Sequence, residues 1–457
     1  MENKQASYGT TIMVLLCVIM VFSTIAYGAV DTTALGVLTI LGGAITITWL
    51  VRLVSRQQIE LNTDPLLLPI LGWIFIGLIQ LLPLGPGDSS GALQIDTSRS
   101  ISLDPFATRL FIVRLVVFLV FFAAALTFIN SAKRKRIIAA FIVAFGALMA
   151  FYGILQWLTK PGGIYGLRPT PQAIPFASFV NQHHFAALME MTIGVGLGIL
   201  LATKPKLDRT PLLLFALLIM AVAILLTSSR GGMLSLIAVL AVVGFFSLSL
   251  RGEDSAGEPA ARRAIQSRLA IIAGLSVGFV VVAGMALFLG GTESFMRGVL
   301  MQVGENDFTS GRAHFWTIAW QIFTSHPIIG AGFDSFGVAY TRYDTLNGLF
   351  RVEQAHNDYL QTLADSGIIG FAALAAFICL LFRKGLRTIA ETTDRMGLGI
   401  AVGALAGCTG ILTHSFFDFP LRTPANAFFF LILVSLAVTK VDAERTKPRH
   451  RHAISAR

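Results

Sequence analysis

Apolar runs of about 20 residues recur from one end of this 457-residue chain to the other. Each run is long enough to cross a hydrocarbon core roughly 30 Å thick as an α-helix. The runs are continuously apolar rather than alternating, which favours a bundle of helices over a membrane β-barrel. Only 13% of the residues are charged, whereas soluble domains carry about 25%. The sequence therefore predicts an all-α polytopic membrane protein.

We predict about twelve transmembrane helices from these runs. The first run follows only one lysine, Lys4, and is long for the apolar part of a signal peptide, so we interpret it as a membrane span. The expected spans cover residues 11–30, 33–51, 66–84, 110–130, 137–158, 184–202, 211–228, 232–250, 269–290, 367–382, 396–413 and 424–439.

The loop charges predict the orientation of these spans. If the N-terminus lies in the cytoplasm, most of the 35 Lys and Arg residues fall on the cytoplasmic side, where membrane proteins concentrate them. An even number of spans also returns the basic tail, residues 441–457, to that side. We expect both termini to be cytoplasmic. The same loops account for the net charge of +10, so we expect no nucleic-acid binding.

Histidine and arginine gather on the opposite, non-cytoplasmic side. Arginine outnumbers lysine there, and its planar guanidinium binds phosphate through paired hydrogen bonds. The pattern favours an anion-binding surface, although any one of these arginines could instead anchor a helix end. Six of the eight histidines lie on or near this side, namely His183, His184, His314, His326, His356 and His414.

Two of these arginines sit where helices are expected to begin. Arg230 lies between two apolar runs, in a Ser-Arg-Gly-Gly turn whose glycines allow close backbone approach. A charge at so tight a turn is costly without a partner. Arg312 precedes an amphipathic stretch, residues 313–324, that we expect on the membrane surface. Its guanidinium and the free amides of the first helical turn could together bind an anion.

The segment around His356 is the sharpest single signal. It predicts a short helix that ends near Gly367, with His356 at the boundary between water and membrane beside Asn357 and Tyr359. Histidine changes charge near neutral pH and can act as a general base toward a hydroxyl. The alternative is a helix cap with a buried, hydrogen-bonded histidine.

Two further polar segments flank the apolar runs on this side. Asn181, His183 and His184 stand where an outer loop enters a span, and His414 and Asp418 stand where a later span leaves. Either segment could bind a sugar hydroxyl or could serve the structure alone. We expect no metal site, because no acidic residue or further histidine lies at helical ligand spacing.

Together these motifs resemble the O-antigen ligase and polymerase superfamily. The resemblance covers roughly residues 170–440, whereas residues 1–169, the first five spans, match only in hydropathy. Its elements are the turn at 229–232, Arg312 with Trp316, Pro327 with Gly330 and Gly332, and the run at 356–361.

The resemblance implies a fold similar to the lipid-linked-sugar (C-type) glycosyltransferases, with a long periplasmic loop over residues 291–366. It implies a multi-pass enzyme of the bacterial inner membrane that works without metal or other cofactor. This enzyme would transfer a glycan from undecaprenyl diphosphate, with inversion, to an acceptor hydroxyl on the periplasmic face. The acceptor would be a glycan, lipid A core or a protein, so surface polysaccharide ligation and polymerisation both stay open. Other polysaccharide-assembly proteins are candidate partners.

The resemblance also implies roles for individual residues. Arg230 and Arg312 would bind the diphosphate and stabilise the leaving group, and His356 would activate the acceptor hydroxyl. These three would be the catalytic residues. The expected substrate-binding residues are Arg168, Asn181, His183, His184, Asn357, Tyr359, His414 and Asp418.

Two other functions compete with the enzyme. A transporter or flippase of the same superfamily should place ionisable residues near the bilayer midplane, where Glu190 and Arg114 are the main candidates. The other polar residues lie at one face, which favours surface chemistry over alternating access. A structural membrane subunit would leave the outer histidines unexplained.

Overall fold

The fold is helical throughout the part of the chain that the structure describes. The computed structural model describes residues 2–56, 62–85, 99–171, 173–203, 210–253, 312–345 and 352–440, and every regular element within them is a helix. Among these described elements, eight helices are long and apolar enough to cross a membrane. The prediction of an all-α polytopic membrane protein is therefore confirmed.

The helices follow one another closely along the chain. Those of the first half are α1 (Glu2–Ile25), η1 (Tyr27–Ala29), α2 (Thr32–Arg56), α3 (Leu67–Gln80), α4 (Pro105–Phe128), α5 (Ala132–Thr159), α6 (Gln182–Ala202), α7 (Thr210–Leu226) and α8 (Arg230–Glu253). Those of the second half are α11 (Arg312–Ser325), α12 (Phe336–Tyr340), α13 (Asp358–Glu391), α14 (Arg395–His414), η2 (Pro420–Arg422) and α15 (Pro424–Val438).

Each expected span that falls on described residues coincides with a helix. Three of these helices, α3, α7 and α15, are shorter than the others, with 14, 17 and 15 residues. The expected amphipathic helix over 313–324 is α11. The expected span at 269–290 and the basic tail lie outside the described residues.

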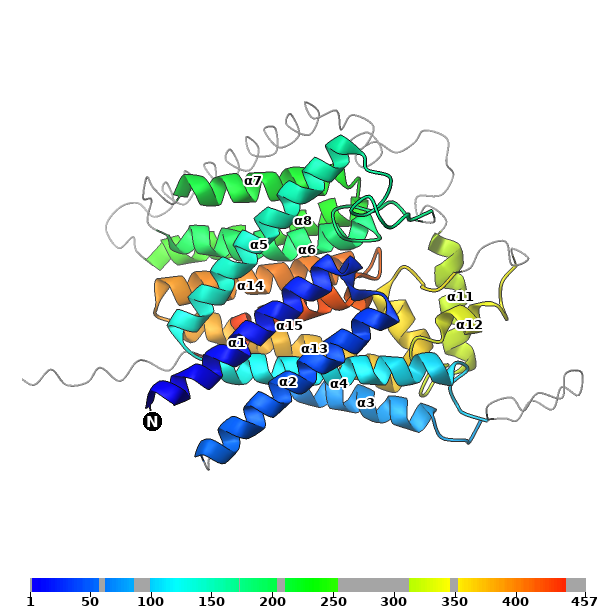
Figure 1. The fold of residues 1–457 in the computed structure, drawn as a ribbon. Coiled ribbons are helices and arrows are strands. Elements are labelled where there is room, and N and C mark those ends of the chain that lie inside the picture. The colour runs from blue at the N-terminus through cyan, green and yellow to red at the C-terminus, as the bar shows by residue number, and fades with distance from the viewer. Residues whose placement is uncertain are drawn as a thin grey trace, which may run out of the picture.

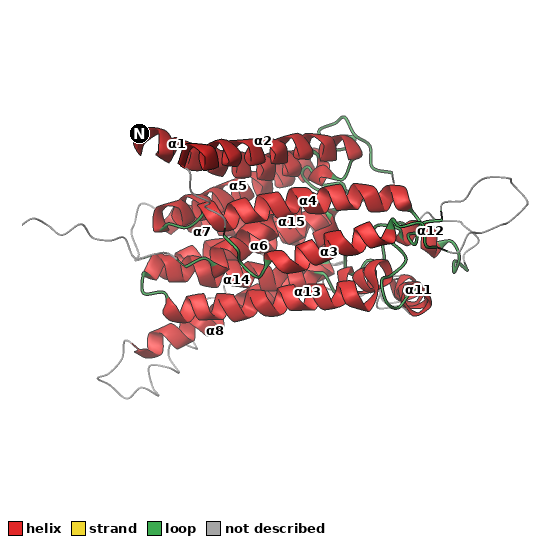
Figure 2. Cartoon of the chain, turned by 90° about the horizontal axis from the view of Figure 1, so that it is seen from below, coloured by secondary structure: helices red, strands yellow, loops and turns green. Residues whose placement is uncertain are grey.

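The long helices run side by side, roughly along one direction (Figure 1). Helix α11 lies across one end of this bundle, and Figure 2 shows the same placement from below. The N-terminus lies at the opposite end (Figure 1). We call the first of these ends the α11 end.

Glycines let α6 and α14 pack backbone against backbone. A Cβ atom at Gly198 would lie 2.1 Å from the carbonyl oxygen of Gly399, and one at Gly194 would lie 2.6 Å from the amide nitrogen of Gly407. Glycines four residues apart share one helix face, and such small residues let membrane helices approach closely. The two helices run antiparallel, so the start of α6 and the end of α14 lie together.

A kink in α13 stands where the sequence predicted a helix end. Gly367 has φ 63° and ψ −164°, which only glycine adopts easily. The loop after α11 covers the kink, since the amide of Ile368 donates to the Pro327 carbonyl at 2.8 Å and that of Gly332 donates to the Asp365 carbonyl at 3.1 Å. The predicted short helix therefore ends at this kink, and the span follows it directly within α13.

The glycine contact between α6 and α14 predicts that a single added methyl group lowers the stability of the protein. We expect Gly198→Ala to lower the thermal unfolding midpoint in detergent, because the new Cβ would overlap the Gly399 carbonyl, and overpacking typically costs about 1–3 kcal/mol. Gly43→Ala in α2 is the matched control, since its Cβ would have no atom within 4 Å. Equal midpoints for the two variants would contradict the contact.

Candidate functional site

A buried carboxylate, Asp418, organises the polar site in the loop after α14. Its side chain is 1% exposed. Oδ1 lies 3.2 Å from His356 Nδ1, and Oδ2 accepts a hydrogen bond from Arg312 Nη2 at 3.4 Å. Arg312 Nη1 donates to the carbonyl of Phe417. One short loop therefore positions both the imidazole and the guanidinium.

The surroundings of Asp418 keep its carboxyl group ionised. Burial alone would raise its pKa. The hydrogen bond from His356 and the electrostatic influence of His183, His356 and Arg312 outweigh burial and hold the pKa well below its usual range. The loop therefore carries a fixed negative charge among groups that are or can become positive.

The backbone and the neighbouring rings fix the orientation of His356. Its φ of 51° lies in the left-handed region, which costs a non-glycine residue roughly 1–3 kcal/mol and occurs most often at functional sites. Its ring stacks on Phe315 at 5.8 Å between centroids and meets the edge of Phe419 at 4.9 Å. The side chain is nevertheless 29% exposed. With Nδ1 on Asp418, Nε2 is the nitrogen left to exchange a proton with a substrate.

The residues after His356 tie the start of α13 to the end of α14. Asn357 caps α13, because its Oδ1 accepts from the amides of Tyr359 and Leu360 at 3.0 and 3.1 Å. The Tyr359 hydroxyl donates to the Leu412 carbonyl at 2.6 Å. Asn357 and Tyr359 were expected to bind substrate, and these contacts give both a positioning role. Their contact with a substrate stays a prediction.

The turn before α8 joins the same site through its small residues. The Oγ of Ser229 lies 2.8 Å from His183 Nδ1. A Cβ atom at Gly231 would lie 2.8 Å from the His414 ring, so only glycine allows this approach. Arg230, the first residue of α8, stands between these two contacts. The structure thus brings the Ser-Arg-Gly-Gly turn to the α11 end, as its proposed role requires.

A second carboxylate–imidazole pair lies deeper in the bundle. Glu190 Oε1 lies 2.8 Å from His414 Nδ1, and both side chains are at most 1% exposed. Among described atoms, His414 Nε2 and Glu190 Oε2 have no hydrogen-bond partner. Sequence reasoning did not assign Glu190 to the site. The sequence spacing could have assigned it, because Glu190 follows His183 by seven residues and therefore lies on the same helix face.

Helix α6 also contributes its first residues. Asn181 caps it, with Oδ1 accepting from the His183 amide at 2.8 Å. His184 Nδ1 lies 2.7 Å from the hydroxyl oxygen of Thr423, and its Nε2 lies 4.0 Å from Asp418 Oδ1. His184 therefore links the start of α15 to the Asp418 loop.

Arg168 occupies a different neighbourhood. It pairs with Asp31, with 3.0 Å between Nη2 and Oδ1, and its guanidinium lies 4.6 Å from the centre of the Tyr27 ring. Both partners belong to the connection between α1 and α2. The expected role of Arg168 in substrate binding stays a prediction. In the structure, the pairing of Arg168 with Asp31 holds the loop before α6.

One group of side chains has the composition of a metal site. One ligand atom each of His183, His414 and Asp418 lies within 4.8 Å of the others. The sequence spacing does not reveal this group, because the three residues come from separate segments. However, Arg312 already pairs with Asp418. Its fixed positive charge favours an anion over a metal cation at this place.

The bundle and its polar end define a class of protein: a polytopic membrane protein with a buried carboxylate, imidazole and guanidinium site at one end. The family model for O-antigen ligases matches residues 215–375, a stretch that contains Arg230, Arg312 and His356. The predicted resemblance to the O-antigen ligase and polymerase superfamily is thereby confirmed. Asp418 lies outside the matched stretch. No curated protein matches the chain significantly.

The low pKa of Asp418 predicts how Asp418→Asn changes stability with pH. A carboxyl group with a lowered pKa in the folded state stabilises the fold above its unfolded pKa of about 4, and this stabilisation fades as the pH falls toward the folded value. We expect the variant to melt several degrees below the wild type, by a margin that persists between pH 8 and pH 5 and shrinks only below about pH 4.

Asp394→Asn is the matched control, because Asp394 forms an ion pair with Arg136 in which both side chains are about half exposed. Exposed pairs contribute little, so we expect a much smaller margin. A margin for Asp418→Asn that vanishes between pH 8 and pH 5 would contradict an ionised Asp418 at neutral pH.

Proposed function

We propose that this protein is a membrane glycosyltransferase of the O-antigen ligase type. It transfers a glycan from undecaprenyl diphosphate to an acceptor hydroxyl. The observation that carries the proposal is the arrangement of His356 and Arg312 on the two oxygens of Asp418. A base and a cation held side by side are what the attack on a diphosphate-linked sugar needs.

In this mechanism His356 is the general base. The acceptor hydroxyl gives its proton to His356 Nε2 as its oxygen attacks the anomeric carbon of the donor sugar. Asp418, on Nδ1, holds the ring in the required tautomer and stabilises the imidazolium that forms. Direct attack from the side opposite the diphosphate inverts the configuration at that carbon.

The two arginines stabilise the leaving group. As the bond between the anomeric carbon and the diphosphate oxygen breaks, negative charge grows on the diphosphate. Arg312 has five N–H donors and uses two of them on Phe417 and Asp418, so others are left for phosphate oxygens. Arg230 supplies a second guanidinium from the start of α8. These charges let the reaction proceed without a metal ion or other cofactor.

We further propose that the α11 end faces the periplasm of a bacterial inner membrane. The N-terminus lies at the opposite end (Figure 1), and the loop charges favour a cytoplasmic N-terminus. Glu190, one of the two residues that a transporter would most readily use, pairs with His414, the last residue of α14, which favours the enzyme over a transporter. The acceptor is a glycan, lipid A core or a protein, and its identity decides between ligation and polymerisation.

The test is glycan transfer by the purified protein from an undecaprenyl-diphosphate glycan, with several acceptors and with EDTA present, read by mass spectrometry. We expect transfer to survive EDTA. Replacing His356, Arg312 or Arg230 by Ala should lower the transfer rate by about 10²- to 10⁴-fold, because each change removes the base or a charge that stabilises the leaving group. Arg312→Lys should also fail, since an ammonium cannot reproduce the planar fork.

His326→Ala and Arg136→Ala are the controls for histidine and arginine loss. His326 follows α11, and Arg136 is a half-exposed residue paired with Asp394. Both variants should transfer at the wild-type rate. Absence of transfer with every acceptor, or full transfer by His356→Ala, would overturn the proposed function.

A further inference from the structure

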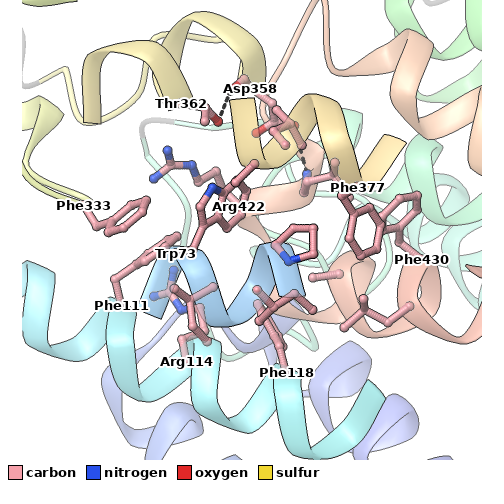
Figure 3. Close-up of a pocket in the computed structure, with 18 of the residues that line it drawn as sticks. Trp73, Phe111, Arg114, Phe118, Phe333, Asp358, Thr362, Phe377, Arg422 and Phe430 are labelled. Carbon is pink, nitrogen blue, oxygen red and sulfur yellow. Dashed lines mark hydrogen bonds between the residues drawn. The ribbon is translucent and has the colours of Figure 1, made fainter. Parts of the chain in front are cut away.

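A cavity of about 130 Å³ lies beside the site, between α3, α4, α13, α15 and the η2 turn. Figure 3 shows Arg114 and Arg422 on one side of it and Phe377 and Phe430 on the other. Side chains of Phe, Leu and Ile supply most of its wall. The cavity is therefore amphipathic, with an apolar part and one edge of arginines that pair with carboxylates.

Most polar groups in the wall already have partners. The Trp73 indole donates to a backbone carbonyl at 2.8 Å, and the Tyr359 hydroxyl donates to another at 2.6 Å. The Asp358 carboxylate accepts from the Ser415 hydroxyl at 2.8 Å. Because these groups are satisfied, the apolar part offers a ligand hydrocarbon contact and little hydrogen bonding. This disfavours a sugar and favours a lipid chain.

The edge that holds the two arginines is different. Arg422 Nη2 donates to Asp365 Oδ2 at 2.6 Å and its Nη1 lies 3.5 Å from Asp334 Oδ1, whereas Arg114 Nη1 lies 3.9 Å from Asp334 Oδ2. Among the described residues, Arg114 Nε is a buried donor without a hydrogen-bond partner. Both guanidiniums lie within 6 Å of the centre of the Phe111 ring, at 5.6 and 5.3 Å. The arginines of this edge are therefore largely balanced by the carboxylates of Asp334 and Asp365.

The cavity and the proposed catalytic site share two chain segments. Asp358 and Tyr359, which line the cavity, follow His356 directly along the chain. Leu421, also in the wall, follows Asp418 by three residues. Three residues span at most about 11 Å, so a diphosphate held at the site would have its lipid chain near the cavity.

We propose that this cavity binds the isoprenoid chain of the donor, at the isoprene unit nearest the diphosphate. The inference rests on the proposed function and names where the donor's lipid is recognised. The volume fits the assignment, because apolar cavities of about 150 Å³ bind molecules the size of benzene, and one isoprene unit has five carbons. Aromatic walls match the flat, branched shape of such a unit.

The test fills the cavity by placing a larger side chain at a lining residue of α13. Ala373 lines it, whereas its neighbour Ala372 is exposed and lies outside the wall. Binding of undecaprenyl phosphate is measured by native mass spectrometry for the wild type, Ala373→Phe and Ala372→Phe. Phosphatidic acid, which carries the same phosphate on acyl chains, is the comparison lipid. We expect Ala373→Phe to weaken undecaprenyl phosphate binding at least about tenfold, the typical loss when a small hydrocarbon is excluded from its pocket.

Ala372→Phe should bind undecaprenyl phosphate like the wild type, and phosphatidic acid binding should not change in either variant. Ala373→Leu fills less volume and should show an intermediate loss, which keeps the test valid if the Phe variant does not fold. Unchanged binding by folded Ala373→Phe, or an equal loss of phosphatidic acid, would overturn the assignment. A selective loss in a protein that transfers no glycan would support the lipid site while the proposed function fails.

Discussion

The burial of the Asp418 carboxylate is the constraint on which the polar end of the molecule depends. A charge that is 1% exposed is stable only with positive partners and hydrogen bonds around it. Arg312 from α11 and His356 before α13 provide them, and so two segments far apart in the sequence are drawn to one loop. The same pairing that stabilises the carboxylate gives His356 the orientation that its proposed role as a general base requires.

The helices beneath this loop are positioned by a different force. Glycines on α6 and α14 remove the side chains between two backbones, and the close contact fixes how the helices align along the bundle. That alignment sets the start of α6 beside the end of α14, and with it His183, Glu190 and His414. An apolar packing surface in the membrane thus decides where the polar groups of the site meet.

Much of this arrangement could be predicted from the sequence, because local patterns determine it. Continuous apolar runs predicted the helices, the stripe after Arg312 predicted α11, and Gly367 marked a real break in helix geometry. The partners could not be predicted, since Glu190 and His414 are 224 residues apart and His356 and Asp418 are 62 apart. Sequence spacing carries information about one helix face, not about which two faces touch.

We propose that the α11 end binds a lipid-linked diphosphate between Arg230 and Arg312, with the sugar facing position 356. A cryo-EM structure of the His356→Ala variant with an undecaprenyl-diphosphate glycan tests it most directly. We predict phosphate oxygens within hydrogen-bond distance of both guanidiniums and the anomeric carbon turned toward residue 356. A diphosphate bound at the opposite end of the bundle, or away from both arginines, would contradict the account.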